Sequence, residues 1–226
     1  MRRHIPNFLT CCNLFSGCLG VVFCLEGRAI PAAYFVWASA VFDFFDGFAA
    51  RWLKASSPIG KELDSLADMV SFGLLPALVM YKLIAATEAH PMLAYVAFFI
   101  AVGSALRLAI FNIDETQTDS FRGLNTPANT LFITALPFLA AVAGHWLLQP
   151  VVLVSITLLF SWLLVSPLRF FAFKFKNFSW ADNQVRFTFL ALAASLLVIL
   201  HAAAIPLIIL LYIALSFGLH VQGKQT

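Results

Sequence analysis

The sequence predicts an all-α fold, a polytopic transmembrane helical bundle of six to eight spans. Only 11% of the 226 residues are charged, whereas a soluble domain carries about 25%. The apolar residues make up 62% of the chain and run in long blocks without alternation, so a transmembrane β-barrel is not expected. By its length the chain is one integral membrane domain, residues 1–226.

The apolar blocks divide into candidate spans, each close to the ~20 residues that cross the hydrocarbon core. They cover residues 5–26, 30–50, 61–83, 92–112, 127–148, 150–170, 186–203 and 205–221. The first starts at Pro6 and Asn7, with Asn7 as a candidate N-cap, and we expect it to be retained rather than cleaved. Ser71 and Pro76 make the third span less regular. A turn around Pro206 separates the last two, which are alternatively one re-entrant hairpin.

The positive charges predict the orientation of the chain. With the N-terminus in the cytoplasm, only Arg28 and Lys82 fall on the outer side. All the others fall inside: Arg2, Arg3, Arg51, Lys54, Lys61, Arg107, Arg122, Arg169, Lys174, Lys176, Arg186 and Lys224. This bias predicts a multi-pass protein of the cell's inner membrane with a cytoplasmic N-terminus. The net charge of +3 then faces anionic lipid, and no nucleic-acid partner is expected.

The segment 43–68 concentrates the acidic side chains. Asp43 and Asp46 are three residues apart and share a face of one helix, and Asp64 and Asp68, four apart, share a face of the next. Hard cations such as Mg²⁺ and Mn²⁺ prefer oxygen ligands, and unpaired carboxylates are costly inside a membrane. The spacing therefore predicts a divalent-metal site, in which we expect two ions. The alternative is ordinary solvated charge at helix ends.

Small residues accompany the carboxylates. Gly47 and Ala50 follow Asp43 by four and seven positions, and Gly60 precedes Asp64 by four, so they lie on the carboxylate faces. Small side chains there leave a hollow in which a flat group can lie against backbone. Arg51 adds a cation suited to a phosphate oxygen. This combination favours metal-assisted chemistry on a diphosphate.

From Asp43 to Asp68 the chain resembles the CDP-alcohol phosphotransferase family, whose signature is Asp-x2-Asp-Gly-x2-Ala-Arg-x8-Gly-x3-Asp-x3-Asp. The resemblance implies that family's fold and the following roles. Asp43, Asp46, Asp64 and Asp68 would bind two Mg²⁺ or Mn²⁺ ions, Asp68 would also be the catalytic base, Gly47, Ala50 and Gly60 would form the cytidine pocket, and Arg51 would support the nucleotide phosphate.

Three further polar residues are candidates for the nucleotide site. The family often opens with Pro-Asn-x-x-Thr, which here makes Asn7 and Thr10 candidates to reach the diphosphate. Ser56 or Ser57 is expected to cap the helix that begins near Pro58. The hydroxyl of Ser57 is also a candidate phosphate contact.

Residues 64–73, 106–112 and 123–128 resemble the integral-membrane phosphatidylserine synthases of bacteria and archaea. Ser65 stands where relatives that make phosphatidylglycerophosphate usually carry proline, while Asn125 departs from the serine-synthase pattern, which more often has proline there. The resemblance implies phosphatidyl transfer from CDP-diacylglycerol to L-serine, with release of CMP. Members are commonly homodimers.

An arginine inside the fourth span suggests where the acceptor binds. Arg107 is costly in a membrane unless it faces a polar site. We therefore expect Arg107 to hold the serine carboxylate, with help from Asn112 and Thr126. The alternative is that Arg107 extends its charged end to the inner membrane surface.

Two other functions fit parts of the pattern. The same chemistry could use another acceptor, namely inositol phosphate, glycerol 3-phosphate or choline. A cation-coupled transporter could use the four aspartates as an ion site. The transporter is disfavoured because the carboxylates are expected at the inner membrane edge and the sequence contains no recognisable inverted repeat.

Overall fold

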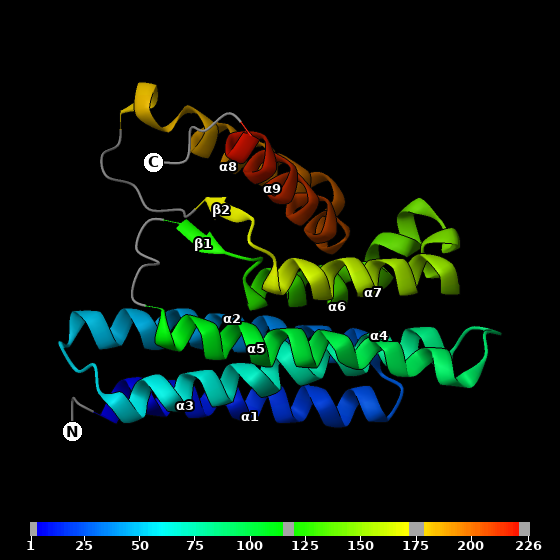
Figure 1. The fold of residues 1–226 in the computed structure, drawn as a ribbon, viewed down its shortest axis with the longest axis horizontal. Helices are drawn as coiled ribbons and strands as arrows, with labels where there is room; N and C mark the ends of the chain where they lie inside the picture. Colours follow the sequence, from blue (N-terminus) through cyan, green and yellow to red (C-terminus); the bar gives the residue numbers. More distant parts are fainter. Residues whose placement is uncertain (1–3, 115–119, 172–178, 222–226) are drawn as a thin grey trace.

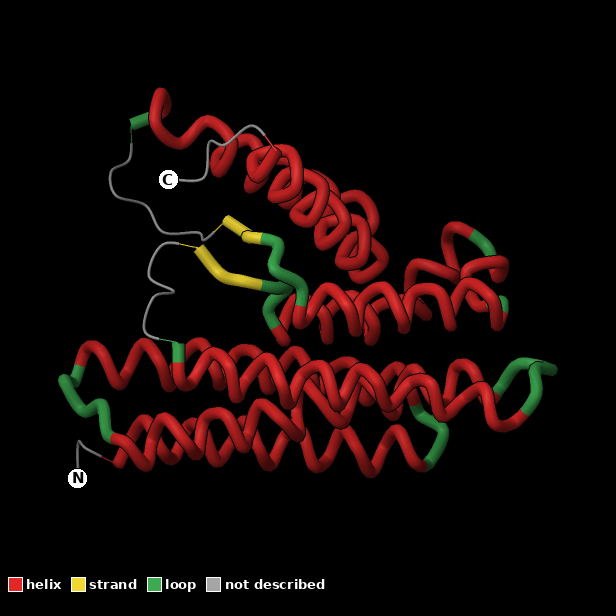
Figure 2. The backbone as a smooth tube through the Cα atoms, in the orientation of Figure 1, coloured by secondary structure: helices red, strands yellow, loops and turns green. Residues whose placement is uncertain are grey.

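The structure is a computed structural model that describes residues 4–114, 120–171 and 179–221, which are mostly helical (Figure 2). The positive charges expected at Arg2, Arg3, Lys174, Lys176 and Lys224 lie outside these ranges.

The first half of the chain forms one layer of long helices (Figure 1). Its elements are α1 (Ile5–Leu25), α2 (Ala29–Trp52), α3 (Pro58–Asp68), a π-helix (Met69–Leu74), α4 (Leu75–Ala85), a 3-10 helix (Pro91–Phe98) and α5 (Phe99–Ile113). Helix α1 packs along α2 and also against α3 and the π-helix. The two helices that carry the aspartates are therefore both held by α1.

The irregularity predicted for the third span is the π-helix. Pro76 has no N–H to donate to the carbonyl four residues earlier, that of Phe72. The hydroxyl of Thr130 lies 2.8 Å from this carbonyl and 2.8 Å from the Thr126 carbonyl, so it shares its single proton between them. Helix α6 is thereby bonded to the chain directly after the aspartates.

The second half of the chain covers this layer. It contains β1 (Ser120–Arg122), α6 (Thr126–Ala143), a 3-10 helix (His145–Leu148), α7 (Pro150–Val165), β2 (Arg169–Phe171), α8 (Trp180–Leu200), a 3-10 helix (His201–Ala203) and α9 (Ala204–Val221). Helix α7 packs on α5, α6 packs on α2, and α8 and α9 pair with each other, with α9 against α6. Figure 1 shows the α8–α9 pair farthest from α1.

A short antiparallel ribbon joins β1 to β2, which the sequence did not predict. Phe121 pairs with Phe170, and Arg122 pairs with Arg169. The chain leaves β1 through Gly123, whose φ is +74° and where a Cβ would collide with the carbonyl of Leu164. Only glycine allows this close approach to the end of α7.

The segments long and apolar enough to cross a membrane number five among the described residues. They are Ile5–Leu25, Pro58–Ala85, Pro91–Ile113, Thr126–Ala143 and Asn183–Leu219, and Pro150–Val165 is a shorter apolar helix. The chain is therefore a multi-pass membrane protein, and the predicted all-α bundle is confirmed.

Two predicted boundaries are wrong. The span placed at 150–170 ends at Val165, because Ser166 and Pro167 follow and Arg169 belongs to β2. The turn placed around Pro206 lies earlier, at His201, which has a φ of 50°. Pro206 instead sits in the first turn of α9, where its missing N–H removes no helical bond.

Some of the charged residues lie at opposite ends of the helical layer. The N-terminus, the α2–α3 turn and the end of α5 lie at one end of the layer, and the α1–α2 and α4–α5 turns lie at the other (Figure 2). At that other end Lys82 Nζ donates to the carbonyl of Leu25 at 3.1 Å, next to Arg28. Arg51 and Lys61 lie at the first end, on either side of the α2–α3 turn.

Candidate active site

Three carboxylates from two helices converge. Asp43 lies on α2, and Asp64 and Asp68 lie one turn apart on α3. One oxygen of each lies within 4.8 Å of those of the other two. Asp68 is buried and the others are half-buried. Asp64 Oδ1 is buried with no hydrogen-bond partner in the described part of the chain, which fits a cluster that binds a divalent cation.

The fourth predicted ligand, Asp46, lies beside this cluster and not within it. It is buried on α2, and its Oδ2 accepts a 2.7 Å hydrogen bond from Thr10 Oγ1. The same hydroxyl also lies 3.1 Å from the Pro6 carbonyl, so its single proton is shared between the two acceptors. Thr10, predicted to face the diphosphate, thus fixes Asp46 to α1.

A pocket of about 310 Å³ adjoins the carboxylates. A volume of this size fits a small ligand. Its lining is Pro6, Asn7, Thr10, Asp46, Gly47, Ala50, Ala55, Ser56, Ser57, Gly60, Lys61 and Asp64. The structure therefore brings together all the predicted nucleotide-binding residues except Arg51. The sequence analysis did not predict Ala55 and Lys61, because neither belongs to a recognised motif.

Gly60 lines this pocket where only a residue without a side chain fits. A Cβ at Gly60 would lie 3.1 Å from Asn7 Oδ1 and 3.1 Å from Ser57 Oγ, so any side chain would intrude on both polar groups. Ser57 caps α3 as expected, because its Oγ accepts from Gly60 N at 3.1 Å. Asn7 is not the N-cap of α1; that position is His4.

Arg51 lies at the edge of the pocket. Its side chain is exposed, and its Nη1 is 3.6 Å from where a Cβ would stand at Gly47. The guanidinium therefore lies over the glycine that lines the pocket, within reach of an anion that projects from it.

Asn13 is a site residue that sequence reasoning missed. It is fully buried on α1, and its Nδ2 donates to Asp68 Oδ1 at 3.1 Å. A signal existed, because Asn7, Thr10 and Asn13 are three residues apart and so share a face of the helix. That polar face points at both aspartate helices.

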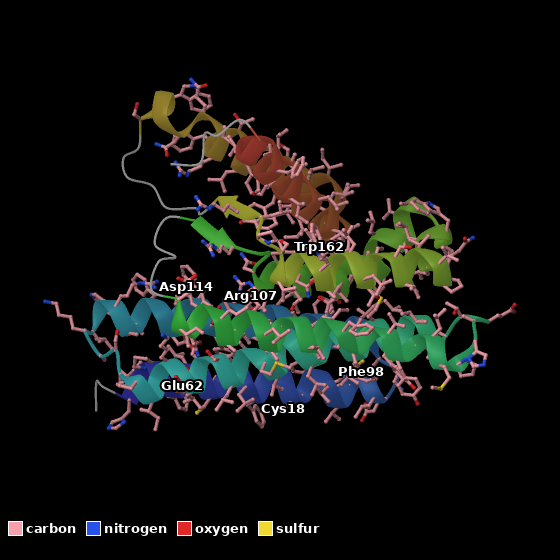
Figure 3. All side chains as sticks on the ribbon, viewed as in Figure 1. Cys18, Glu62, Phe98, Arg107, Asp114 and Trp162 are labelled. Atoms are coloured by element: carbon pink, nitrogen blue, oxygen red, sulfur yellow. The ribbon has the colours of Figure 1, made fainter. Side chains whose placement is uncertain are left out.

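The predicted acceptor residues are in three different surroundings. Arg107 is only 8% exposed, its Nε has no hydrogen-bond partner among the described residues, and it interacts electrostatically with Asp68 and Tyr212. Asn112 donates to Ser65 Oγ at 2.9 Å. Thr126 is buried at the start of α6. Figure 3 shows Arg107 where α5 faces the β1–β2 ribbon.

Two more buried polar side chains flank the π-helix. Ser104 Oγ and both amide atoms of Asn129 have no hydrogen-bond partner within the described ranges. Ser104 contacts Gly73, since its Cβ is 3.3 Å from where a Cβ of Gly73 would stand. Asn129 precedes the Thr130 that bonds Phe72. Both were missed, because serine and asparagine inside apolar spans carry no motif.

Comparison with known proteins identifies the family. Residues 3–165 match the family model of the CDP-alcohol phosphatidyltransferases. The chain belongs to the CDP-alcohol phosphatidyltransferase family. The match includes the aspartates, the pocket and Arg107, while β2, α8 and α9 lie beyond it.

Several curated proteins to which the chain is similar carry the name CDP-diacylglycerol–serine O-phosphatidyltransferase. The protein of Bacillus subtilis is 33% identical over 173 residues, which cover 76% of this chain and 92% of that protein. The protein of Helicobacter pylori strain J99 is 35% identical over 57% of this chain and 54% of its own length. That of Saccharomyces cerevisiae is 34% identical over 60% and 54%.

The carboxylates fit the divalent-metal dependence of the CDP-alcohol phosphatidyltransferases. Asp43, Asp64 and Asp68 supply the hard oxygen ligands that such ions prefer. The unpaired Oδ1 of Asp64 is a buried acceptor that a cation would satisfy.

Proposed function

We propose that this chain transfers the phosphatidyl group of CDP-diacylglycerol to L-serine, giving phosphatidylserine and CMP. The observation that carries the proposal is the convergence of Asp43, Asp64 and Asp68 beside a pocket built from the residues of the family signature. The names of the curated relatives support serine as the acceptor. The whole chain, residues 1–226, would act as one catalytic domain around the motif 43–68.

The donor would bind with its cytidine in the pocket and its acyl chains in lipid. Gly47 and Gly60 let a flat ring approach the backbone. Asn7 and Ser57 offer polar groups on the pocket wall, and Arg51 lies at its edge, suited to a phosphate oxygen. The diphosphate would then lie over Asp46 and Asp64, which also line the pocket.

Asp43, Asp46, Asp64 and Asp68 would hold Mg²⁺ or Mn²⁺, as a pair of ions. Bound divalent ions neutralise a diphosphate and stabilise the leaving nucleotide. The serine hydroxyl oxygen forms a bond to the β-phosphorus, and the bond from that phosphorus to the bridging oxygen breaks. CMP leaves with the bridging oxygen, and the hydroxyl proton passes to Asp68, the residue we assign as general base.

Arg107 would bind the serine carboxylate. Arg107 is only 8% exposed, and its Nε has no hydrogen-bond partner among the described residues, which supports a role in binding an anion. A planar guanidinium binds a carboxylate through two parallel hydrogen bonds. Asn112, through Ser65, and Thr126 at the start of α6 would complete the acceptor side.

The active site would face the cytoplasm from the inner membrane of the cell. Arg51 and Lys61 lie at the end of the layer that carries the aspartates, and Arg28 and Lys82 lie at the opposite end, as the positive-inside rule requires. Family membership also supports a homodimer, which a detergent-corrected mass measurement would test.

The test follows CMP release by purified protein in detergent with CDP-diacylglycerol and Mg²⁺ or Mn²⁺. L-serine, glycerol 3-phosphate, inositol phosphate and choline are added singly, with an Asp68→Asn variant as control. We expect release with serine alone, abolished in the control. Release with a different alcohol would overturn the acceptor, and no release with any alcohol from folded protein would favour a cation transporter.

A further inference from the structure

Asn13 lies outside the family signature and yet contacts one of its aspartates. Its side chain is fully buried in the apolar helix α1, and its Nδ2 donates to Asp68 Oδ1 at 3.1 Å. We propose that Asn13 is a positioning residue, which fixes the orientation of the Asp68 carboxylate for metal binding. The importance of Asp68 rests on the proposed function, but the contact itself does not.

The backbone of Asn13 holds α1 to both aspartate helices. Its carbonyl accepts hydrogen bonds from Ser39 Oγ and Ser71 Oγ, each at 3.1 Å. Ser39 lies one turn before Asp43 on α2, and Ser71 lies three residues after Asp68. One residue of α1 is therefore hydrogen-bonded to both segments that carry the clustered carboxylates.

The close approach of α1 leaves little freedom at this point. One turn beyond Asn13, a Cβ at Gly17 would collide with Ser71 Oγ. Ser39 and Ser71 are themselves fully buried. Asn13 and the two serines that bond its carbonyl are therefore all fully buried. The backbone from which the Asn13 amide reaches Asp68 is held in place.

The amide of Asn13 restrains the carboxylate of Asp68. The terminal torsion of an aspartate is broad when nothing restrains it. By holding Oδ1, Asn13 restrains this torsion and so fixes the direction in which both carboxylate oxygens point. The Asn13 Oδ1 is buried and has no hydrogen-bond partner elsewhere in the described chain. This fits a site in which a bound ligand supplies the missing donor.

The test measures Mn²⁺ binding by electron paramagnetic resonance of the free ion, without substrate. Asn13→Leu keeps the approximate shape, removes the amide and leaves both serine bonds in place, since these end on the backbone carbonyl. We expect the Kd for Mn²⁺ to rise by about 10- to 100-fold, as for other residues that orient metal ligands. The kcat for CMP release should fall while the KM for CDP-diacylglycerol stays near the wild-type value.

Two control variants separate orientation from packing. Ser39→Ala removes one bond to the Asn13 carbonyl and keeps the amide. Ser16→Ala removes the 2.8 Å bond from Ser16 Oγ to the Phe35 carbonyl, another contact between α1 and α2. Both should bind Mn²⁺ like the wild type. If Asn13→Leu does not fold, Asn13→Ala, which only shortens the side chain, gives the same comparison.

An unchanged Kd in folded Asn13→Leu would overturn the proposal. So would a Kd that rises equally in Ser39→Ala, because packing would then be the cause. These results are independent of the proposed reaction. If the wild type releases no CMP with serine, the proposed function fails, and the Mn²⁺ titration still decides the role of Asn13.

Discussion

The nucleotide pocket depends on a residue that has no side chain. Gly60 is flanked by Asn7 Oδ1 and Ser57 Oγ, both 3.1 Å from where its Cβ would be. Contacts that close require the neighbours to move. Because these neighbours are the polar groups on the pocket wall, a change at Gly60 acts on ligand binding before it acts on the fold.

We expect Gly60→Ala to raise the KM for CDP-diacylglycerol about tenfold, which is within the ~1–3 kcal/mol cost of overpacking. The KM for serine should stay unchanged. Gly218→Ala is a matched control, since a Cβ there meets nothing within 4 Å. Equal lipid KM values in the two variants would show that the glycine does not shape the donor site.

The proposed acceptor site would depend on the geometry of Arg107 as well as on its charge. Arg107→Lys keeps a cation but loses the planar fork that pairs with a carboxylate. We expect the KM for serine to rise about tenfold or more in Arg107→Lys, and further in Arg107→Ala, with the KM for the lipid unchanged. Arg28→Ala, at the opposite end of the layer, should have no effect. An unchanged serine KM in both Arg107 variants would contradict the assignment.

Helical spacing and a known signature predicted which residues meet, but not every partner they find. Gly47, Ala50 and Gly60 line one pocket because each lies a whole number of turns from an aspartate. Asn13 was missed because a polar residue in an apolar helix has many possible partners. Its contact to Asp68 spans 55 positions of sequence, and only packing decides it.

At the scale of elements, the π-helix Met69–Leu74 connects the carboxylate cluster Asp43, Asp64 and Asp68 to helix α6. Pro76 removes a donor that the carbonyl of Phe72 would otherwise have, and Thr130 on α6 supplies another. Such π-helical turns occur often at functional sites. Here the turn directly follows Asp68, so its geometry sets how that aspartate is presented.

We expect Thr130→Val to lower the free energy of unfolding by about 1–2 kcal/mol, because a buried carbonyl loses its hydroxyl partner. Thr134→Val is the matched control: Thr134 is also fully buried, but its Oγ1 bonds only the Thr130 carbonyl within α6, at 2.8 Å. Unfolding in mixed micelles would compare the two. Equal losses of stability would show that the hydrogen bond to Phe72 contributes no more than a bond within α6.

The sequence predicted the existence of the helices better than their irregularities. Ser71, Gly73 and Pro76 indicated a weak point in the third span, but no single residue specifies π-helical hydrogen bonding. The β1–β2 ribbon was missed because each strand is only three residues long, and the pairing of Phe121 with Phe170 depends on how α6 and α7 place their ends.

At the scale of the whole molecule, the charges and the site lie at the same end. Glu62 and Asp114 lie toward the end that holds the aspartates, and Phe98 lies in the other half of the layer (Figure 3). The predicted orientation rests on the positive charges of all the loops together and not on a single charge.

Accessibility of single cysteines in intact cells would test the orientation. In a chain whose native cysteines are replaced by alanine, Glu88→Cys lies in the exposed turn before the 3-10 helix Pro91–Phe98, and Glu62→Cys lies on the exposed side of α3. A membrane-impermeant maleimide should label the first and not the second. Both should react after the membrane is opened. The reverse pattern would place the aspartates outside.

All the residues that line the proposed nucleotide pocket fall between Pro6 and Asp64. The pocket and the three clustered carboxylates are therefore encoded in the first 68 of the 226 residues, within α1, α2 and α3. Elements near the N-terminus are synthesised first and can fold before the rest of the chain. During synthesis the nascent protein could assemble its donor site from the first three helices while the segment that carries Arg107 is still on the ribosome.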